Sequence, residues 1–573
     1  MSRVLIAISL CSCVVISLMA APANDNVAKF VDDYYQALFT WDPNQATAAG
    51  IHNFDDKLPD LSQTAHVRRA KELHVFQDRL AKLREGKLSA SDAMDAELLD
   101  HALKAELLEN ETVRDWRRNP VTYLGNPAGA IDNLMKRNFA SPPERLRSVI
   151  GRLRETPSLM QSMKHNVKNP PREFADLGVI VVHGSIGFFR DTLPDWAKTA
   201  AGSDHKLLED FHRANKAALA AMESAQTWIK DEMLPQAKGN YSIGSDAFLK
   251  KLQYEEMLDI PLDKLLAIGE ANLAKDKADF IATAAKIAPN KTPADVLKEL
   301  SLNHPSPDDL VPATRGVLER IRQFIVEKHV VTIPSEVRPT VLETPAFQRT
   351  GGFASMDTPG AFETKATEAF YYVTPPEKEW DKQRKAEHMA QFNLTGLEVI
   401  SIHEAYPGHY IQFLYAKQYP TKVRKLYTCG TNVEGWAHYC EQMMLDESYG
   451  GGDPKVKLAQ LSEALLRDCR YIVGIKLHTQ GMTVEEGKKF FMEQGFIEGE
   501  TAFQEARRGT YNPTYLYYTL GKLQIYKLRE DVRRLKGADF NLELFHNEFV
   551  KQGGIPAKLM RKIFLGNDAG PSL

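Results

Sequence analysis

The sequence predicts a mainly α-helical protein with a small β-sheet. Long segments carry apolar residues at the three- and four-residue spacing of an amphipathic helix. Prolines and glycines separate these segments, as at residues 306–309 and 450–454, without forming a long linker. The segments expected to be helical are residues 27–39, 62–84, 91–110, 143–166, 205–233 and 262–287.

Prolines and β-forming residues define the remaining elements. Pro261 can occupy the first turn of the last of these helices, because a first-turn residue needs no N–H partner. Pro339 removes a hydrogen bond from any strand that contains it, so its segment can be an edge strand at best. The strand-like segments are residues 329–333, 337–342 and 369–374.

Composition argues against several classes of partner. The chain has 573 residues, of which 43% are hydrophobic and 26% are charged, and its formal net charge is −3. These are ordinary values for a globular protein with a large core. Because the chain lacks long basic or acidic runs, nothing favours a nucleic acid or an anionic membrane as a partner.

The N-terminus has the pattern of a secretory signal peptide. Arg3 precedes an apolar stretch over residues 4–21, and small residues such as Ala23 follow, so cleavage is expected near residue 21 or 23. An uncleaved anchor is the alternative, because the apolar stretch is long for a signal peptide. A lipoprotein is less favoured, since Cys11 and Cys13 lie inside the stretch without a good lipobox.

Export would then leave a single helical domain in the periplasm or outside the cell. The signal peptide is expected at residues 1–21 and the domain at residues 22–573. Within the domain we expect an N-terminal helical part over about residues 22–325 and a metal-site part over about residues 326–573.

Three cysteines remain after cleavage, at Cys429, Cys440 and Cys469. An odd number in an exported protein leaves at least one thiol unpaired or bonded between chains. Buried free thiols are favoured over a disulfide between Cys429 and Cys440, and none is expected to bind the metal.

The segment His403-Glu404-Ala-Tyr-Pro-Gly-His409 contains the residue types of a hydrolytic zinc site. Its histidines offer imidazole nitrogens to a metal, and Glu404 can accept a proton from water. A lone His-Glu pair on a helix usually has no catalytic role. A further acid, Glu434, follows at a suitable distance on a second amphipathic segment, and makes a metal site the favoured interpretation.

The two histidines are six residues apart, which a regular helix does not allow for two ligands of one ion. Six residues correspond to a rotation of about 240° and a rise of about 9 Å, whereas both nitrogens must lie about 2.0–2.1 Å from zinc. We therefore expect the helix to break between them. Pro407 lacks an N–H and Gly408 allows unusual backbone angles, so both favour a kink or wide turn.

Two motifs, His403-Glu404-x-x-Pro-Gly-His409 and Glu434-Gly-Trp-Ala, resemble the signature of the bacterial domain-of-unknown-function family 885 (DUF885). The resemblance covers nearly all of the mature chain and is strongest over about residues 369–529. Members of the family are regarded as zincin-like and mainly helical. They are distantly similar to thimet-oligopeptidase-like and Taq-carboxypeptidase-like metallopeptidases, and the six-residue spacing agrees with this family.

The resemblance implies a site and a shape. His403, His409 and Glu434 would bind Zn²⁺, and Glu404 would be the general base. Zinc chemistry agrees, because two imidazoles and one carboxylate leave a fourth position open for water. The implied shape is a two-lobed helical fold with a cleft, and with a small β-sheet beside the metal helix.

Further residues are expected to contact the substrate. Residues 370–373, including Tyr372, are the candidate edge strand that aligns a peptide, although an ordinary buried strand is equally compatible. Tyr518 and His478 are expected to stabilise the oxyanion, and Arg507 to bind a substrate carboxylate. The alternative for each of these three side chains is packing or exposure to solvent.

His438 lies four residues after Glu434, on the same helical face. It either supports a metal ligand from behind or replaces His409 as a ligand.

The favoured function is an exported zinc-dependent peptidase that hydrolyses short peptides, with Glu404 as general base on a metal-activated water. The alternatives are a zinc hydrolase of another amide or ester, and a non-catalytic exported protein that binds a metal or a peptide. Short peptides are the expected partners. No nucleic acid is expected, nor any stable membrane insertion once the signal peptide is cleaved.

Overall fold

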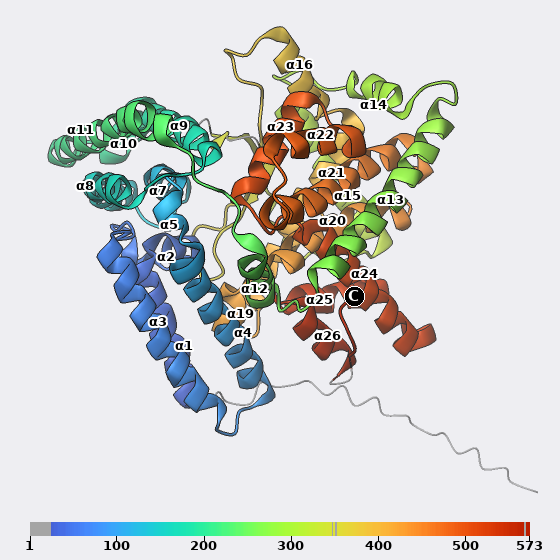
Figure 1. The fold of residues 1–573 in the computed structure, drawn as a ribbon, viewed down its shortest axis with the longest axis horizontal. Helices are drawn as coiled ribbons and strands as arrows, with labels where there is room; N and C mark the ends of the chain where they lie inside the picture. Colours follow the sequence, from blue (N-terminus) through green and yellow to red (C-terminus); the bar gives the residue numbers. More distant parts are fainter. Residues whose placement is uncertain (1–24, 346–347, 350–351, 567–568) are drawn as a thin grey trace, which may run out of the picture.

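The computed structural model describes residues 25–345, 348–349, 352–566 and 569–573. Within these residues the protein is a large, mainly helical fold with one three-stranded sheet, as the sequence predicts (Figure 1). The expected signal peptide, residues 1–21, lies outside the described residues. No helix in the described part of the chain is both long enough and apolar enough to cross a membrane.

The largest apolar core surrounds the sheet and joins the two ends of the chain. Phe30 of the first helix and Phe549 near the C-terminus belong to the same buried cluster. The expected division at about residue 325 therefore does not separate two cores. The helices of this region are α1 (Asp25–Trp41), α2 (Pro43–Ala49), α3 (Gln63–Arg84), α4 (Ala90–Leu107), α15 (Leu310–Lys328), α16 (Lys382–Ala390), α17 (Leu394–Glu404), α18 (His409–Leu414), α19 (Lys422–Leu426), α20 (Gly430–Asp446), α24 (Tyr517–Lys536), α25 (Leu542–Lys551) and α26 (Ala557–Leu565).

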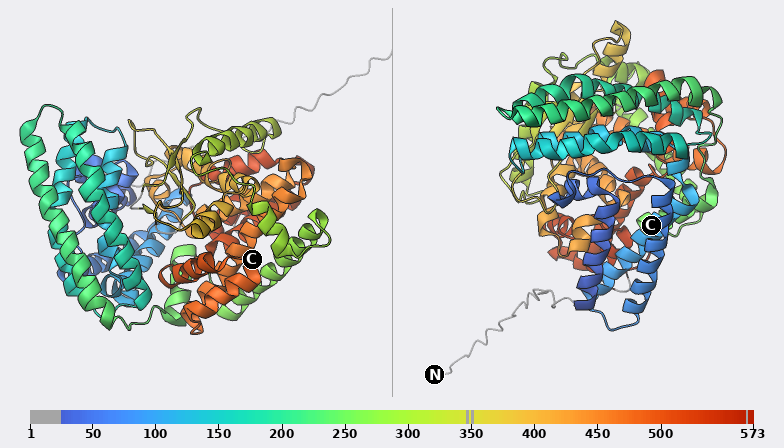
Figure 2. Two further views of the ribbon diagram at one scale, coloured as in Figure 1. Left: turned by 90° about the horizontal axis from the view of Figure 1, so that it is seen from above. Right: turned by 90° about the vertical axis from the view of Figure 1, so that its left-hand side faces the viewer.

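A second core belongs to a helical lobe of its own. Figure 2 shows α8 to α11 packed together at one side of the molecule. The lobe therefore contains fewer residues of the chain than the N-terminal part expected from the sequence. Its helices are α5 (Asp115–Arg118), α6 (Val121–Leu124), α7 (Asn126–Lys136), α8 (Pro142–Asn166), α9 (Arg172–Gly187), α10 (Leu193–Ala201) and α11 (His205–Trp228).

A third core packs helices from the middle of the chain against later ones. Tyr471 of α21 lies against Gly269 of α13, where any side chain would meet the ring, and donates a hydrogen bond to the carbonyl of Leu265 at 2.9 Å. The helices are α12 (Gly244–Glu256), α13 (Leu262–Ile287), α14 (Pro293–Ser301), α21 (Pro454–Thr479), α22 (Val484–Gly495) and α23 (Gly499–Tyr511).

The sheet has the strand order β1-β3-β2, with β1 at Thr340–Glu343, β2 at Ala354–Asp357 and β3 at Phe370–Val373. β3 pairs in parallel with β1 and antiparallel with β2. The expectation that residues 370–373 form an edge strand is therefore wrong, because β3 has a partner on both sides. β1 begins directly after Pro339 and is an edge strand, as this proline predicts.

The expected helices are present, and their ends follow local chemistry. α3 begins after Ser62, whose hydroxyl accepts a hydrogen bond from the N–H of Ala65 and so caps the helix. Pro261 precedes α13 as its N-cap and does not lie in its first turn. The expected helix over residues 205–233 is continuous, but it widens to a π-helix at Ile229.

Cys429, Cys440 and Cys469, the cysteines in the described part of the chain, are buried free thiols, as expected. Burial raises the pKa of each thiol well above its ordinary value. They therefore stay protonated and are poor metal ligands.

A half-buried histidine connects the N-terminal helices to the segment that follows β2. His52 lies between Asp55 and Glu363, with nitrogen–oxygen distances of 2.9 Å to both, and its ring stacks on Phe139. Burial alone would lower the pKa of His52, but the two carboxylates outweigh burial and raise it. Together with a hydrogen bond from the N–H of Phe362 to the carbonyl of Ala49, this ion-paired group holds the segment around Glu363 against α2.

Candidate metal centre

The helix breaks between the two motif histidines, as their spacing requires. α17 ends one residue after His403, and α18 begins at His409. The two rings are buried, their centres lie 4.9 Å apart, and their planes are at 88° to each other. The predicted break around Pro407 is confirmed.

The turn between α17 and α18 depends on Gly408. Its N–H donates to the carbonyl of Ile402 at 3.1 Å, and an added Cβ would stand 1.8 Å from the carbonyl oxygen of His403. Only glycine avoids this clash. On the other side, the indole N–H of Trp436 donates to the carbonyl of Pro407 at 2.9 Å. The proline and glycine of the first motif and the tryptophan of the second therefore fix one turn together.

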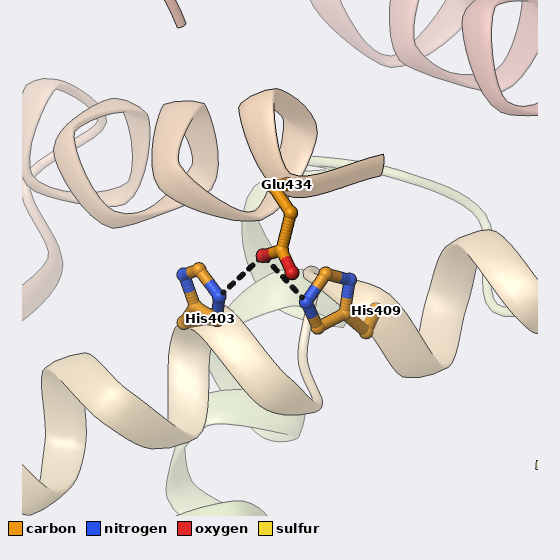
Figure 3. A group of neighbouring side chains, drawn as sticks. All are labelled: His403, His409 and Glu434. Atoms are coloured by element: carbon orange, nitrogen blue, oxygen red, sulfur yellow. Dashed lines mark ion pairs between the residues drawn. The ribbon is translucent and has the colours of Figure 1, made fainter. Parts of the chain in front are cut away.

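Glu434 of α20 completes a three-residue group with His403 and His409, which is called the metal group below (Figure 3). Its Oε2 lies 3.3 Å from Nε2 of His403 and 3.3 Å from Nε2 of His409. One ligand atom from each residue lies within 4.8 Å of the others. Figure 3 shows the carboxylate directed between the two rings, which come from separate helices.

The donor set and its charges fit a zinc ion. Oε2 of Glu434 is buried and forms no hydrogen bond of good geometry within the described part of the chain. Burial alone would raise the pKa of Glu434, but His409 and His403 hold it well below its ordinary value. Burial likewise opposes charge on His403, yet Glu434 and Glu441 raise its pKa to about 9. The group thus attracts positive charge, and two imidazoles with one carboxylate are the donors of hydrolytic zinc sites.

A second carboxylate contacts the ring nitrogen of His403 that does not face Glu434. Glu441 is completely buried, and its Oε1 lies 2.7 Å from Nδ1 of His403. Arg467 of α21 lies 3.1 Å from the same oxygen, and Nδ1 of His438 lies 3.0 Å from the other oxygen. Burial alone would raise the pKa of Glu441, but Arg467 and His438 hold it well below its ordinary value. The ionised carboxylate therefore fixes His403 with Nδ1 toward Glu441 and Nε2 toward Glu434.

His438 supports the group indirectly and does not belong to it. Its ring is completely buried, and burial lowers its pKa to about 3. It contacts Glu441, whereas His409 provides the second imidazole of the group. Of the two roles that the sequence allows for His438, the geometry favours indirect support of His403 through Glu441.

A helix cap and a close contact between two helices position α20. The carboxylate of Glu256 accepts hydrogen bonds from the first two backbone N–H groups of this helix, at 2.8 and 3.0 Å, and so caps it. Further along, Gly435 lies against Gly521 of α24, where a Cβ on Gly521 would stand 2.0 Å from a carbonyl oxygen of α20. The two helices touch through their backbones, which places Glu434 close to Tyr518 at the start of α24.

Glu404 is the last residue of α17 and follows His403 directly. Its side chain is partly buried and makes neither a hydrogen bond nor an ion pair with the residues that the structure describes. It lies near Tyr371, whose pKa is raised by burial and by the charge of Glu404. A carboxylate without a competing partner, on the residue next to a candidate metal ligand, is suited to accept a proton.

Tyr518 lies over the metal group. Its ring is nearly buried and stacks on His403, with 6.2 Å between the ring centres. Burial raises the pKa of the phenol, so it keeps its proton. Arg508 of α23 donates to the phenol oxygen at 3.0 Å, which leaves the O–H of Tyr518 to donate elsewhere.

His478 does not reach the metal group, contrary to the sequence-based prediction. It is completely buried, and its Nε2 lies 2.7 Å from the carbonyl oxygen of Gly509. Its Nδ1 accepts a hydrogen bond from the N–H of Ile243 at 3.4 Å. Backbone groups occupy both ring nitrogens, so this side chain cannot stabilise an oxyanion.

Arg507 also differs from its expected role. It donates a hydrogen bond to Gln504 and lies over the ring of Phe503, at 5.8 Å from the ring centre. Neighbouring residues of a helix point about 100° apart, so Arg507 and Arg508 cannot both face α24. The structure places Arg508 there.

Tyr372 lies in the central strand of the sheet, nearly buried and stacked on Phe370. Successive strand residues point to opposite faces. Its neighbour Tyr371 faces the metal helix, with its hydroxyl 3.2 Å from Oγ of Ser401. Tyr372 is therefore directed away from α17, which argues against the expected substrate contact.

A cavity of about 290 Å³ is lined by residues adjacent to the metal group, although none of His403, His409 and Glu434 lines it. Phe413, whose ring stacks on His409 with 5.9 Å between ring centres, lines it together with Val433, the residue before Glu434. The cavity lies between α1, α2, residues 358–361 and the helices α18 and α20. Other lining residues include Tyr35, Phe39, Tyr419 and Lys425.

Comparison with known proteins assigns the chain to a family. The model of the family described as "Bacterial protein of unknown function (DUF885)" matches residues 43–563, which span most of the chain. The chain belongs to this family. The match covers the metal group and confirms the resemblance to DUF885 seen in the two motifs. No curated protein matches this chain.

Two solved structures are similar to this DUF885 protein. One is described as a candidate lipoprotein of unknown function from Shewanella oneidensis; it is 26% identical, with a TM-score of 0.77, over 94% of this chain and 99% of that chain. The other is described as a candidate lipoprotein from Colwellia psychrerythraea; it is 17% identical, with a TM-score of 0.78, over 93% of this chain and 98% of that chain. The similarity extends over the whole fold in both.

Proposed function

We propose that this DUF885 protein is an exported zinc-dependent peptidase that hydrolyses short peptides. The convergence of His403, His409 and Glu434, with the unpaired carboxylate of Glu404 on the residue next to His403, carries the proposal. Export is supported by the signal-peptide pattern at residues 1–21 and by the description of both similar structures as candidate lipoproteins.

Each residue of the site has a separate role in the proposed reaction. His403, His409 and Glu434 would hold zinc, which when bound acts as a Lewis acid and lowers the pKa of water to about 7. Glu404 accepts the proton of the attacking water and passes it to the leaving amine. Tyr518 donates its O–H to the oxyanion that develops on the substrate carbonyl, because its own oxygen is already occupied by a donor.

The sheet and the cavity favour a peptide over another amide or an ester. β2 is the edge strand that contacts α17, and it pairs with β3 on one side. Its outer edge can add an extended peptide through backbone hydrogen bonds. β2 therefore replaces residues 370–373 as the candidate strand for substrate alignment. The cavity between Phe413 and Val433 could accept one side chain near the scissile bond.

The variant Glu404→Gln tests the proposal. We expect the purified parent protein to hydrolyse a mixed peptide library, read by mass spectrometry, and to carry one zinc per chain. Glu404→Gln should keep the zinc and lose about 10²- to 10⁴-fold in turnover. Glu398→Gln is the matched control, because Glu398 lies on the same helix but pairs with Arg320 at the surface.

Each other outcome of this test has a defined meaning. Parent-like turnover in Glu404→Gln would remove Glu404 from the mechanism. Bound zinc without hydrolysis of any peptide would favour a hydrolase of another amide or ester, or a protein that only binds its ligand.

A further inference from the structure

Three arginines surround Tyr518. The guanidinium carbons of Arg467 and Arg470 lie 5.7 and 5.1 Å from the centre of its ring, and Arg508 donates to its hydroxyl oxygen at 3.0 Å. So much positive charge next to a metal group requires counter-charge. The partners of the three arginines therefore show which of them remain available to a ligand.

Two of the arginines are neutralised within the protein. Arg467 pairs with Glu441 at 3.1 Å and also with Glu463. Arg470 forms two hydrogen bonds with the carboxylate of Glu505, at 2.7 and 2.8 Å. Both are structural ion pairs of buried side chains.

Arg508 is different. No carboxylate among the described residues lies within ion-pair distance of it, and its hydrogen-bond partner is the neutral phenol of Tyr518. It is partly buried, and two carboxylates act on it from a distance: Glu505, whose two oxygens are hydrogen-bonded to Arg470, and Glu434, which is directed at the metal position. A partly buried guanidinium without a carboxylate is a ready site for an anion, because its fork of N–H donors matches a carboxylate.

We propose that Arg508 binds the C-terminal carboxylate of the substrate, so that the enzyme cleaves peptides close to their C-terminus. This inference rests on the proposed peptidase function and adds its substrate class. Arg508 is 3.0 Å from the hydroxyl that would face the oxyanion. Two further hydrogen bonds of about 2.9 Å, one of them from the same Arg508 nitrogen to the carboxylate, place the nearer carboxylate oxygen within about 9 Å of the oxyanion. One residue spans about 3.3–3.6 Å, so the carboxylate lies one or two residues beyond the scissile bond.

Matched peptide pools test the proposal. One pool consists of N-acetylated tetrapeptides with a free C-terminal carboxylate, and the other has the same composition but ends in an amide. We expect the parent protein to cleave the acid pool about tenfold to a hundredfold faster, as for the loss of a hydrogen-bonded charge, and to release one or two C-terminal residues. Equal cleavage of both pools would overturn the proposal. Selective cleavage beside Asp or Glu within the amide pool would also overturn it, because the anion would then be a side chain.

Three variants identify the residue responsible. Arg508→Met should abolish the preference for the acid pool, and Arg508→Lys should restore part of it. Arg507→Met, on the same turn, should keep the preference, because Arg507 contacts Gln504. Tyr518→Phe should slow both pools by the same factor. If Arg508→Met did likewise, Arg508 would act only on Tyr518, and the proposal would be wrong.

A binding measurement separates this inference from the proposed function. Glu404→Gln serves as the background, and retention of the two pools on the immobilised protein is read by mass spectrometry. We expect the acid pool to be retained about tenfold or more over the amide pool, and Arg508→Met in this background to lose the difference. If the parent hydrolyses neither pool but this difference persists, the peptidase proposal fails and the carboxylate site stands. Equal retention of both pools would overturn the carboxylate site.

Discussion

Glu441→Gln is the substitution that tests the support of the metal group most directly. The carboxylate is completely buried, and His403, His438 and Arg467 approach it at 2.7, 3.0 and 3.1 Å. Glutamine keeps the size and can accept from His403 and Arg467 through its single oxygen. It replaces the other oxygen by an NH₂ group and removes the negative charge.

We expect Glu441→Gln to cause a large loss of zinc affinity and a moderate loss of folding stability. Without the charge, the imidazole of His403 is less basic and less firmly oriented, which for such partners of a metal ligand typically costs about 10- to 100-fold in affinity. This corresponds to about 1.4–2.8 kcal/mol. The unfolding free energy should fall by about 1–3 kcal/mol, because Arg467 keeps its second partner, Glu463.

Zinc affinity is measured by competition with a chromophoric chelator, and folding by circular dichroism and thermal unfolding. Glu463→Gln is the control, since it removes the other partner of Arg467 without touching His403. We expect parent-like zinc affinity for the control. A folded Glu441→Gln protein that binds zinc as tightly as the parent would refute the argument that Glu441 orients His403.

Two further predictions concern the turn and the N-terminal helices. Gly408→Ala should lower zinc affinity by more than about tenfold, because the methyl group would displace the turn between the histidine ligands; Gly129→Ala, whose methyl group meets nothing, should bind zinc as the parent does. The raised pKa of His52 predicts stability that is fully present below pH 6.5, its ordinary value, and lost as the pH rises through the folded-state pKa. Thermal unfolding should therefore show a larger difference between the parent and His52→Gln at pH 6 than at pH 8.5, and an equal difference at both would contradict this assignment.

Local patterns were sufficient for the helices that were predicted and for the break between His403 and His409. Ser62 marks the start of α3, and the positions of Pro407 and Gly408 predict the break that brings His409 back to His403. These features depend on neighbouring residues, whose backbone preferences are readable in the sequence.

Features that depend on contacts between distant segments were not predictable. β2 contains few β-forming residues, so β3 could not be recognised as a central strand. Arg507 and Arg508 are indistinguishable without the rotation of their helix about its axis. Glu441, seven residues after Glu434, carries a weak signal, because two turns of a helix return to the same face.

The zinc content of the purified protein and its variants tests the central claim most directly. We predict one zinc per chain in the parent and in His438→Gln, and none in His409→Ala or Glu434→Ala, with all four proteins folded. Retention of zinc by His409→Ala, or its loss from His438→Gln alone, would contradict the assigned ligands. A folded parent that binds no zinc when it is supplied would contradict the metal centre itself.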